Sequence, residues 1–250
     1  MSPINSASNS LPEPKIVITG TGRSGTTLLV QILTDLGLDT GFSSDSPIDK
    51  TTHAGLETGL DSPTAPRIVK SPNLSRRLDA ILAEGNVTVE HVIIPMRDLA
   101  VASASRVRAT KYGSNLHAMG GLFGTTNAVK QQESLALLNY KLMFTLAKYD
   151  IAHTLLLFPR FASDWNYLYS HLSFLDPSIP PEAWQAAVTA RVRPELIHET
   201  PLTRAEQFAT RLGSSYNKMI GRPIRGVRKA LTGQLRQSRK SPDSLNPKPE

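Results

Sequence analysis

The most constraining feature of this sequence is a glycine-rich segment that stands between a short apolar run and a helical pattern. Residues 16–18 are apolar and β-branched, the segment GTGRSGTT (residues 20–27) follows, and apolar residues then recur at helical spacing through residues 28–36. Glycines allow the tight bend that directs successive backbone N–H groups and the positive end of a helix toward one point. The order strand, glycine loop, helix predicts a binding site for a phosphate or sulfate group.

Three more short apolar runs, at residues 67–70, 89–94 and 154–158, precede or follow helical patterns. We expect helices at residues 74–83, 98–110, 131–148, 165–175, 181–192 and 202–212. Residues 41–66 are rich in Ser, Asp, Thr, Gly and Pro and predict mostly loop, with a short helix possible only around residues 54–60. Repeated strand and helix alternation predicts an α/β fold, a P-loop three-layer sandwich with a mainly parallel sheet.

Basic charge is concentrated at the carboxyl end of the chain. The formal net charge is +7, but the last thirty residues hold eight Lys or Arg against two acidic residues, which leaves the rest near +1. We therefore expect no nucleic-acid partner. The composition predicts a disordered lead (residues 1–14), one domain (residues 15–221) and a basic tail (residues 222–250) that either contacts a membrane surface or acidic polymer or is a solvated tail.

Cysteine is absent from the sequence, which excludes disulfides and thiol nucleophiles. The six histidines show no metal-ligand spacing, so we predict no metal site. The polar first fifteen residues lack the apolar core of a signal peptide, and no run of eighteen apolar residues occurs. We expect a cytoplasmic protein.

The glycine pattern admits several interpretations, including a turn that binds nothing. Gly20, Gly22 and Gly25 match the dinucleotide fingerprint G-x-G-x-x-G, but Asp39 does not end a second strand as that fingerprint requires. The sequence departs from the triphosphate-binding pattern G-x-x-x-x-G-K-[ST], because Thr26 occupies the position of the lysine. The hydrolase elbow G-x-S-x-G lacks its second glycine. The loop alone therefore does not select one ligand.

The segment Gly-Thr-Gly-Arg-Ser-Gly-Thr-Thr-Leu-Leu resembles the 5′-phosphosulfate loop of sulfotransferases that use 3′-phosphoadenylyl sulfate (PAPS). Arg23 stands just before Ser-Gly-Thr, as a basic residue does in that family, and an arginine there is nearer the carbohydrate and tyrosylprotein type than the cytosolic small-molecule type. The resemblance implies that Arg23 contacts the bridge to the leaving sulfuryl group. It also implies a donor-binding loop made of Gly22, Arg23, Ser24, Gly25, Thr26 and Thr27.

A second part of the chain shares this resemblance. Sulfotransferases have an arginine at a strand end and a serine eight residues later, which together hold the 3′-phosphate of PAPS; Arg97 and Ser105 have that spacing. Eight residues are about two turns of helix, so a guanidinium and a hydroxyl at these positions can share one phosphate. The resemblance covers mainly residues 15–36 and 67–106. Leu28 departs from it, since many relatives have there a tryptophan that stacks on adenine.

Sulfuryl transfer needs cations near the leaving phosphate and a base near the acceptor hydroxyl. Arg23 and Lys70 are the candidate cations, Lys70 because the family often has a lysine after its second strand. Pro72 occupies the position of the histidine base of the cytosolic enzymes. We expect Glu57 to be the base, because a partly buried glutamate can be tuned toward neutral pH. The remaining candidates are His53, Asp45 and His117.

The sequence thus predicts an enzyme that transfers a sulfuryl group from PAPS to the hydroxyl of a small-molecule or glycan acceptor. Two alternatives stay open: a P-loop nucleotide kinase or hydrolase with an atypical loop, and a protein of the same fold that binds a nucleotide without catalysis. The oligomeric state is left open.

Overall fold

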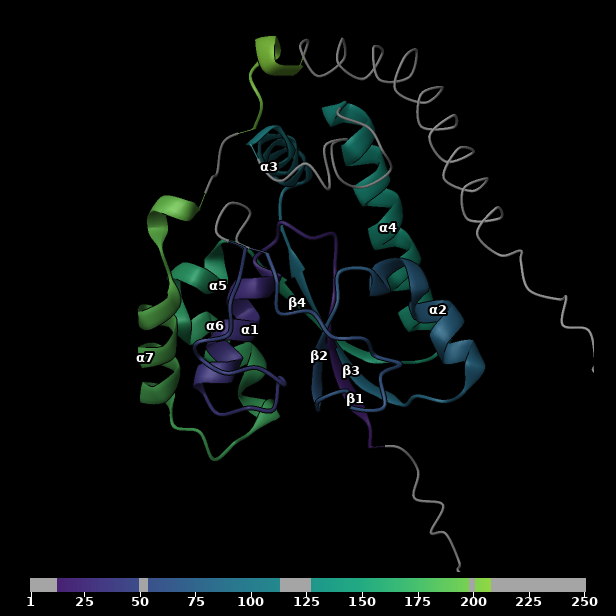
Figure 1. The fold of residues 1–250 in the computed structure, drawn as a ribbon, viewed down its shortest axis with the longest axis vertical. Helices are drawn as coiled ribbons and strands as arrows, with labels where there is room; N and C mark the ends of the chain where they lie inside the picture. Colours follow the sequence, from purple (N-terminus) through teal and green to yellow (C-terminus); the bar gives the residue numbers. More distant parts are fainter. Residues whose placement is uncertain (1–12, 50–53, 113–126, 198–200, 208–250) are drawn as a thin grey trace, which may run out of the picture.

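Four parallel strands form a single sheet at the centre of the molecule (Figure 1). The computed structural model describes residues 13–49, 54–112, 127–197 and 201–207. The strands lie in the order β2-β1-β3-β4, and each neighbouring pair is parallel. Their bounds are β1 (Lys15–Ile18), β2 (Ile68–Lys70), β3 (Val89–Met96) and β4 (Ala152–Leu157). The predicted α/β fold with a parallel sheet is confirmed.

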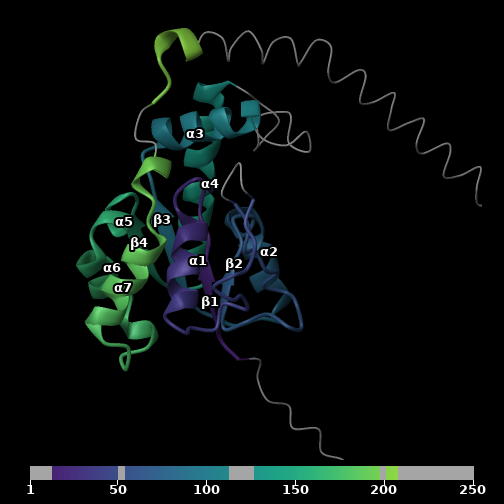
Figure 2. The ribbon, with the colours of Figure 1, turned by 60° about the vertical axis from the view of Figure 1, so that its left-hand side comes forward.

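Helices cover both faces of the sheet and make three layers. They are α1 (Thr26–Asp35), α2 (Leu74–Glu84), α3 (Leu99–Tyr112), α4 (Ala128–Lys148), α5 (Arg160–Ser163), α6 (Trp165–Leu172) and α7 (Pro181–Arg191), with 3-10 turns at Ser173–Leu175 and Pro194–Leu196. The helices α1, α5, α6 and α7 pack on one face, and α2 and α4 on the other. Helix α3 lies across the carboxyl ends of the strands (Figure 2).

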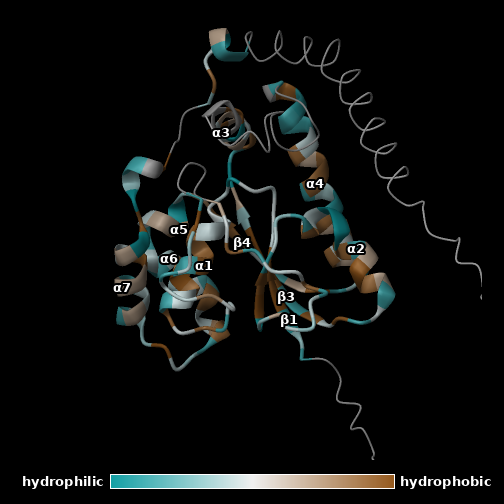
Figure 3. Cartoon of the chain, viewed as in Figure 1, coloured by the Kyte–Doolittle hydropathy of each residue, from teal (hydrophilic) through white to brown (hydrophobic). Residues whose placement is uncertain are grey.

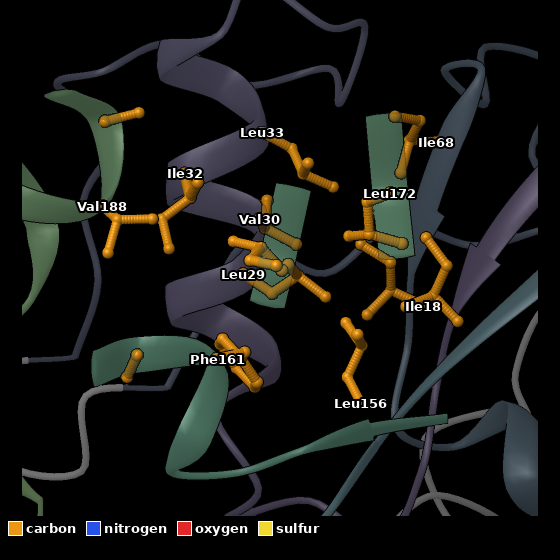
Figure 4. Packing of buried hydrophobic residues seen from close by; sticks show 14 of the residues in the cluster. Ile18, Leu29, Val30, Ile32, Leu33, Ile68, Leu156, Phe161, Leu172 and Val188 are labelled. Atoms are coloured by element: carbon orange, nitrogen blue, oxygen red, sulfur yellow. The ribbon is translucent and has the colours of Figure 1, made fainter. Parts of the chain in front are cut away.

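The alternation of side chains along β1 divides the core into two clusters. Ile16 and Ile18 point into the cluster with α1 and α7, while Val17 lies in the cluster with α2 and α4. Figure 4 shows Ile18 opposite Leu29 of α1, with Phe161 close by. The inner strands β1, β2 and β3 have buried apolar centres (Figure 3), as expected of parallel strands covered on both faces, whereas the edge strand β4 is mostly exposed. The central strand β1 is therefore fixed from both sides.

Strand β3 is longer than the sequence predicts. Pro95 was expected to end it, but the strand runs on to Met96, and Pro95 lies opposite Leu156 of β4. The carbonyl of Ile93 accepts a hydrogen bond from the Thr19 N–H, so Pro95, two residues later, faces the side on which β1 has already ended. The missing N–H of this proline therefore costs no ladder hydrogen bond.

Residues 54–60 lie in the region predicted to be mostly loop and form no regular element, so the helix considered there does not form. Leu56 has a φ of 55°, in the left-handed region that a right-handed helix does not use. Both helices that follow β2 and β3 are preceded by a residue that favours the capping position: Asp98 Oδ1 accepts from the Val101 N–H, whereas Asn73 makes no side-chain cap bond to α2. Helix α4 begins with an unforeseen cap, the side chain of Asn127.

Residues 1–12, 50–53, 113–126, 198–200 and 208–250 lie outside the described residues, and with them His53, His117 and the basic tail. Within the described ranges no helix is long and apolar enough to cross a membrane.

An ion pair joins the carboxyl ends of α1 and α7. Arg191 contacts both carboxylate oxygens of Asp35, one of them at 2.6 Å from Nη2, and the Ser44 hydroxyl donates to the same carboxylate at 2.7 Å. These hydrogen bonds, Arg191 first, lower the pKa of Asp35. Because the native pKa lies below the unfolded one, the pair stabilises the fold above the unfolded pKa of about 3.9 and loses this effect as the pH falls through the native pKa.

We expect Asp35→Asn to lower the free energy of unfolding by about 1–2 kcal/mol at pH 7, because a two-point bond to a charged group is lost. The difference from the parent protein should persist to about pH 5 and shrink below about pH 4. Urea unfolding at pH 7, 5 and 3 measures it. A difference that stayed constant at pH 3 would contradict the role of the charge.

Candidate functional site

The candidate site lies where the chain changes direction across the sheet. From β1 the chain passes through α1 to β2 on one side, and from β2 through α2 to β3 on the other side of β1. Such a reversal opens a crevice at the carboxyl ends of the strands, where ligands of α/β proteins bind. Because all strands are parallel, the glycine loop after β1, Lys70 at the end of β2 and Arg97 after β3 reach the same edge.

The glycine loop bends through left-handed conformations. Gly22, Arg23 and Gly25 have φ values of 70°, 59° and 82°. Left-handed residues within a turn form concave arrangements of backbone N–H groups that hold anions. A side chain at Gly25 is also excluded by packing, since a Cβ there would stand 2.6 Å from the Phe158 ring. A non-glycine residue at positive φ, as at Arg23, is uncommon and concentrates at functional sites.

A buried hydroxyl inside the loop has no hydrogen-bond partner among the described residues. The side chain of Ser24 is fully buried, and its Oγ makes no hydrogen bond to any of the described residues. Gly25 occupies the capping position of α1 and supplies no side-chain cap, so the helix begins without an oxygen facing its N–H groups. A buried polar atom without a partner is unfavourable by about 1–3 kcal/mol. A bound phosphate or sulfate oxygen would satisfy it.

Three residues that the sequence analysis assigned to the donor site come together. The Nε of Arg23 donates to Ser105 Oγ at 3.1 Å, and Nη1 of Arg97 donates to the Arg23 carbonyl at 2.8 Å. Ser105 is 82 residues away from Arg23 in the sequence and lies on α3. A hydroxyl that accepts from Arg23 keeps its own hydrogen to donate to an anion. The guanidinium of Arg97 also lies 4.9 Å from the centre of the Phe158 ring, which holds its direction.

Arg106 belongs to this site and was missed. Its Nη2 donates to the Thr21 carbonyl at 2.6 Å, and a Cβ at position 22 would stand 2.9 Å from the same nitrogen. The guanidinium of Arg106 thus packs against the loop and occupies the space that a side chain at position 22 would need. The one sequence feature that pointed to Arg106 was its position directly after Ser105. Sequence spacing alone, however, does not show whether an arginine on a helix points toward a given loop.

The cationic side chains of the site are partly shielded from water and close to one another. Burial lowers the pKa of Arg23. Burial, and then the charge of Arg23, lower the pKa of Arg106 to about 10. Both guanidinium groups stay protonated at neutral pH. Their proximity makes the loop strongly favourable for an anion.

Lys70 is the centre of a second group of contacts. Its side chain is 2% exposed, and Nζ donates to the Gly55 carbonyl at 2.7 Å, to Glu57 Oε1 at 3.1 Å and to Thr27 Oγ1 at 3.4 Å. Burial lowers its pKa, while the charge and hydrogen bond of Glu57 act in the opposite direction. The contacts place one ammonium group between the start of α1 and the segment that contains Glu57. Lys70 and Glu57, both predicted site residues, are thus direct partners.

The geometry places two of the candidate bases. The Glu57 side chain is 45% exposed and therefore partly buried, on a segment without regular secondary structure. Asp45 lies near Arg191, whose other partner Asp35 ends α1, so it is about one helix length, roughly 15 Å, from the loop. Asp45 is therefore not part of the site. Leu28, in the position of the adenine-stacking tryptophan, packs against the core.

Comparison with known proteins adds no relative: no protein-family model, curated protein sequence or solved structure matches this chain.

Replacement of Gly25 by alanine tests how tightly the loop is built, with Gly37→Ala as the matched control. Both glycines have φ near 80°, so each alanine brings a similar left-handed strain of about 1–2 kcal/mol, but a Cβ at Gly37 meets nothing within 4 Å. The contact with Phe158 should make Gly25→Ala the less stable variant by at least about 1 kcal/mol in urea unfolding. Equal losses would contradict the packing of the loop on Phe158.

Proposed function

We propose that this protein is a sulfotransferase that takes PAPS as donor and transfers its sulfuryl group to a hydroxyl, with a small molecule or a glycan as acceptor. The observation that carries the proposal is the contact of Arg23 with Ser105 and Arg97. The sequence resemblance assigned these residues to donor binding from two separate segments, and the fold brings them within hydrogen-bond distance. The partnerless hydroxyl of Ser24 supports an anion in the loop.

In this proposal the loop residues Gly22 to Thr27 hold the 5′-phosphosulfate, and Arg97 with Ser105 holds the 3′-phosphate. The acceptor oxygen forms a bond to sulfur while the bond from sulfur to the bridging phosphate oxygen breaks. Negative charge then grows on the departing adenosine 3′,5′-bisphosphate, where the guanidinium of Arg23 stabilises it. The acceptor proton passes to Glu57, and Lys70 holds that carboxylate in place at 3.1 Å.

One contact argues against a magnesium-dependent kinase or hydrolase. In the pattern G-x-x-x-x-G-K-[ST], the final hydroxyl binds Mg²⁺, and here Thr27 has that position. Its Oγ1 accepts from the Lys70 ammonium at 3.4 Å and donates to the Gly55 carbonyl, also at 3.4 Å. A positive group already contacts this hydroxyl, so a second cation there is disfavoured.

Calorimetric titration should show tighter binding of adenosine 3′,5′-bisphosphate than of ATP with Mg²⁺, and the opposite order would overturn the proposal.

Substitution of Arg97 tests the assignment of the 3′-phosphate. We expect Arg97→Gln to weaken the binding of adenosine 3′,5′-bisphosphate by about tenfold or more, because a charge-assisted hydrogen bond is lost. Binding of adenosine 5′-phosphosulfate, which lacks the 3′-phosphate, should change much less. Arg77→Gln is the control, since Arg77 is an exposed arginine of α2 that pairs with Asp61. Equal weakening of both ligands would mean that Arg97 supports the loop without reading the 3′-phosphate.

Substitution of Glu57 tests the proposed base separately from donor binding. With labelled PAPS and a panel of hydroxyl acceptors, Glu57→Gln should slow transfer by about 10²-fold or more. Its affinity for adenosine 3′,5′-bisphosphate should stay close to that of the parent protein. Asp61→Asn, which removes a nearby exposed carboxylate, should leave transfer unchanged. Full transfer by Glu57→Gln would assign the base to another group, and donor binding without transfer by the parent protein to any acceptor would favour a binding protein.

A further inference from the structure

Helix α4 has two apolar faces, and the sheet uses one of them. Leu135, Leu138, Leu142 and Leu146 are buried against the core. Roughly opposite to them, Leu137, Tyr140 and Phe144 are 53%, 68% and 60% exposed. Intervals of three and four residues put these three side chains on one line along the helix.

We call this surface the outer α4 face. It consists of Val129, Ala136, Leu137, Tyr140, Phe144 and Ala147, all exposed. The rings of Tyr140 and Phe144 stack with their centres 6.3 Å apart. Single exposed apolar residues are common on protein surfaces, but a contiguous row that includes two aromatic rings marks an interaction site.

Positive charge borders the outer α4 face. Lys130 and Lys141 are exposed and lie three helical turns apart beside Leu137, while Lys148 on the same border is held by Asp79 at 2.8 Å. Glu133 is the one acidic side chain on α4, whose residues are all described; it is exposed and lies on the outer α4 face, one turn from Val129 and one turn from Leu137. Long lysine side chains can lie along an apolar surface and extend their ammonium groups to a neighbouring anionic layer.

The charges select among the partners that could cover this face. The basic tail of the same chain, with eight basic against two acidic residues in the last thirty, would bring like charges onto Lys130 and Lys141. A second copy bound through the same face would bring the Lys130 and Lys141 ammonium groups of two chains toward one another. A bilayer with anionic headgroups complements both the lysines and the tail. Aromatic and leucine side chains beside lysines are also the composition of protein surfaces that lie in a membrane interface.

We propose that the outer α4 face binds the surface of an anionic lipid bilayer, with Leu137, Tyr140 and Phe144 in the headgroup layer and Lys130 and Lys141 against lipid phosphates. This inference does not depend on the proposed function. Helix α3, which contains Ser105 and Arg106, packs against α4.

Vesicle sedimentation of the full-length protein tests the inference. The protein should bind vesicles of phosphatidylcholine mixed with phosphatidylglycerol, bind phosphatidylcholine alone far more weakly, and lose binding as salt is raised. The double substitution Leu137→Ser with Phe144→Ser should weaken binding to the mixed vesicles by about tenfold or more, because two large apolar side chains no longer enter the headgroup layer. Because this variant keeps the basic tail, the loss is due to α4.

The matched control is Leu155→Ser with Leu157→Ser, which removes two comparably exposed leucines from the edge strand β4 and should leave vesicle binding unchanged. Thermal unfolding of both variants checks that the fold is retained. Unchanged vesicle binding by the α4 variant would overturn the proposal, as would a parent protein that does not sediment with the mixed vesicles. A parent dimer in light scattering that becomes monomeric in the α4 variant, with no effect on vesicle binding, would assign the face to a second copy and also overturn it.

Discussion

Parallel pairing of the four strands determines where every candidate functional residue lies. In a parallel sheet each strand ends at the same edge, so the residues that follow β1, β2 and β3 meet although the sequence separates them by tens of residues. Two backbone bonds tie this edge together: the Thr19 N–H donates to the Ile93 carbonyl, and the Ser71 N–H to the Ile18 carbonyl. The glycine loop begins at the end of β1, a strand that is paired on both sides. Because its starting point is fixed in this way, packing of the loop on Phe158 can fix the shape of the loop.

Patterns local in the sequence were enough to predict most of the fold. The four segments predicted as strands form the four strands of the sheet, the glycine loop follows β1 as predicted, and Asp98 caps the helix after β3. The errors arose where the outcome depends on neighbours. Pro95 is tolerated in β3 because β1 has already ended beside it, and the irregular segment 54–60 contacts the Lys70 ammonium through the Gly55 carbonyl and Glu57. Neither neighbour is visible in the local sequence.

The candidate site was predictable to a smaller extent, and for a similar reason. The resemblance to sulfotransferases singled out Arg97 and Ser105 as a pair, but it did not show that Arg23 contacts both of them. Arg106 was not predicted, because it donates to a backbone carbonyl, and every residue type has such a carbonyl. Residue chemistry therefore indicated the class of ligand, while the tertiary arrangement decided which side chains can reach it.

The closeness of Arg23 and Arg106 has a consequence for how long the empty protein survives. Two like charges held together in a partly buried place raise the free energy of the unoccupied state, and an anion that binds between them removes that penalty. Occupancy and folding are then linked, since a ligand that binds the native state alone stabilises it in proportion to the logarithm of its free concentration. Local opening of the loop, and with it cleavage by proteases, would be most frequent when the anion is scarce. The lifetime of the molecule would in this way follow the supply of its own ligand.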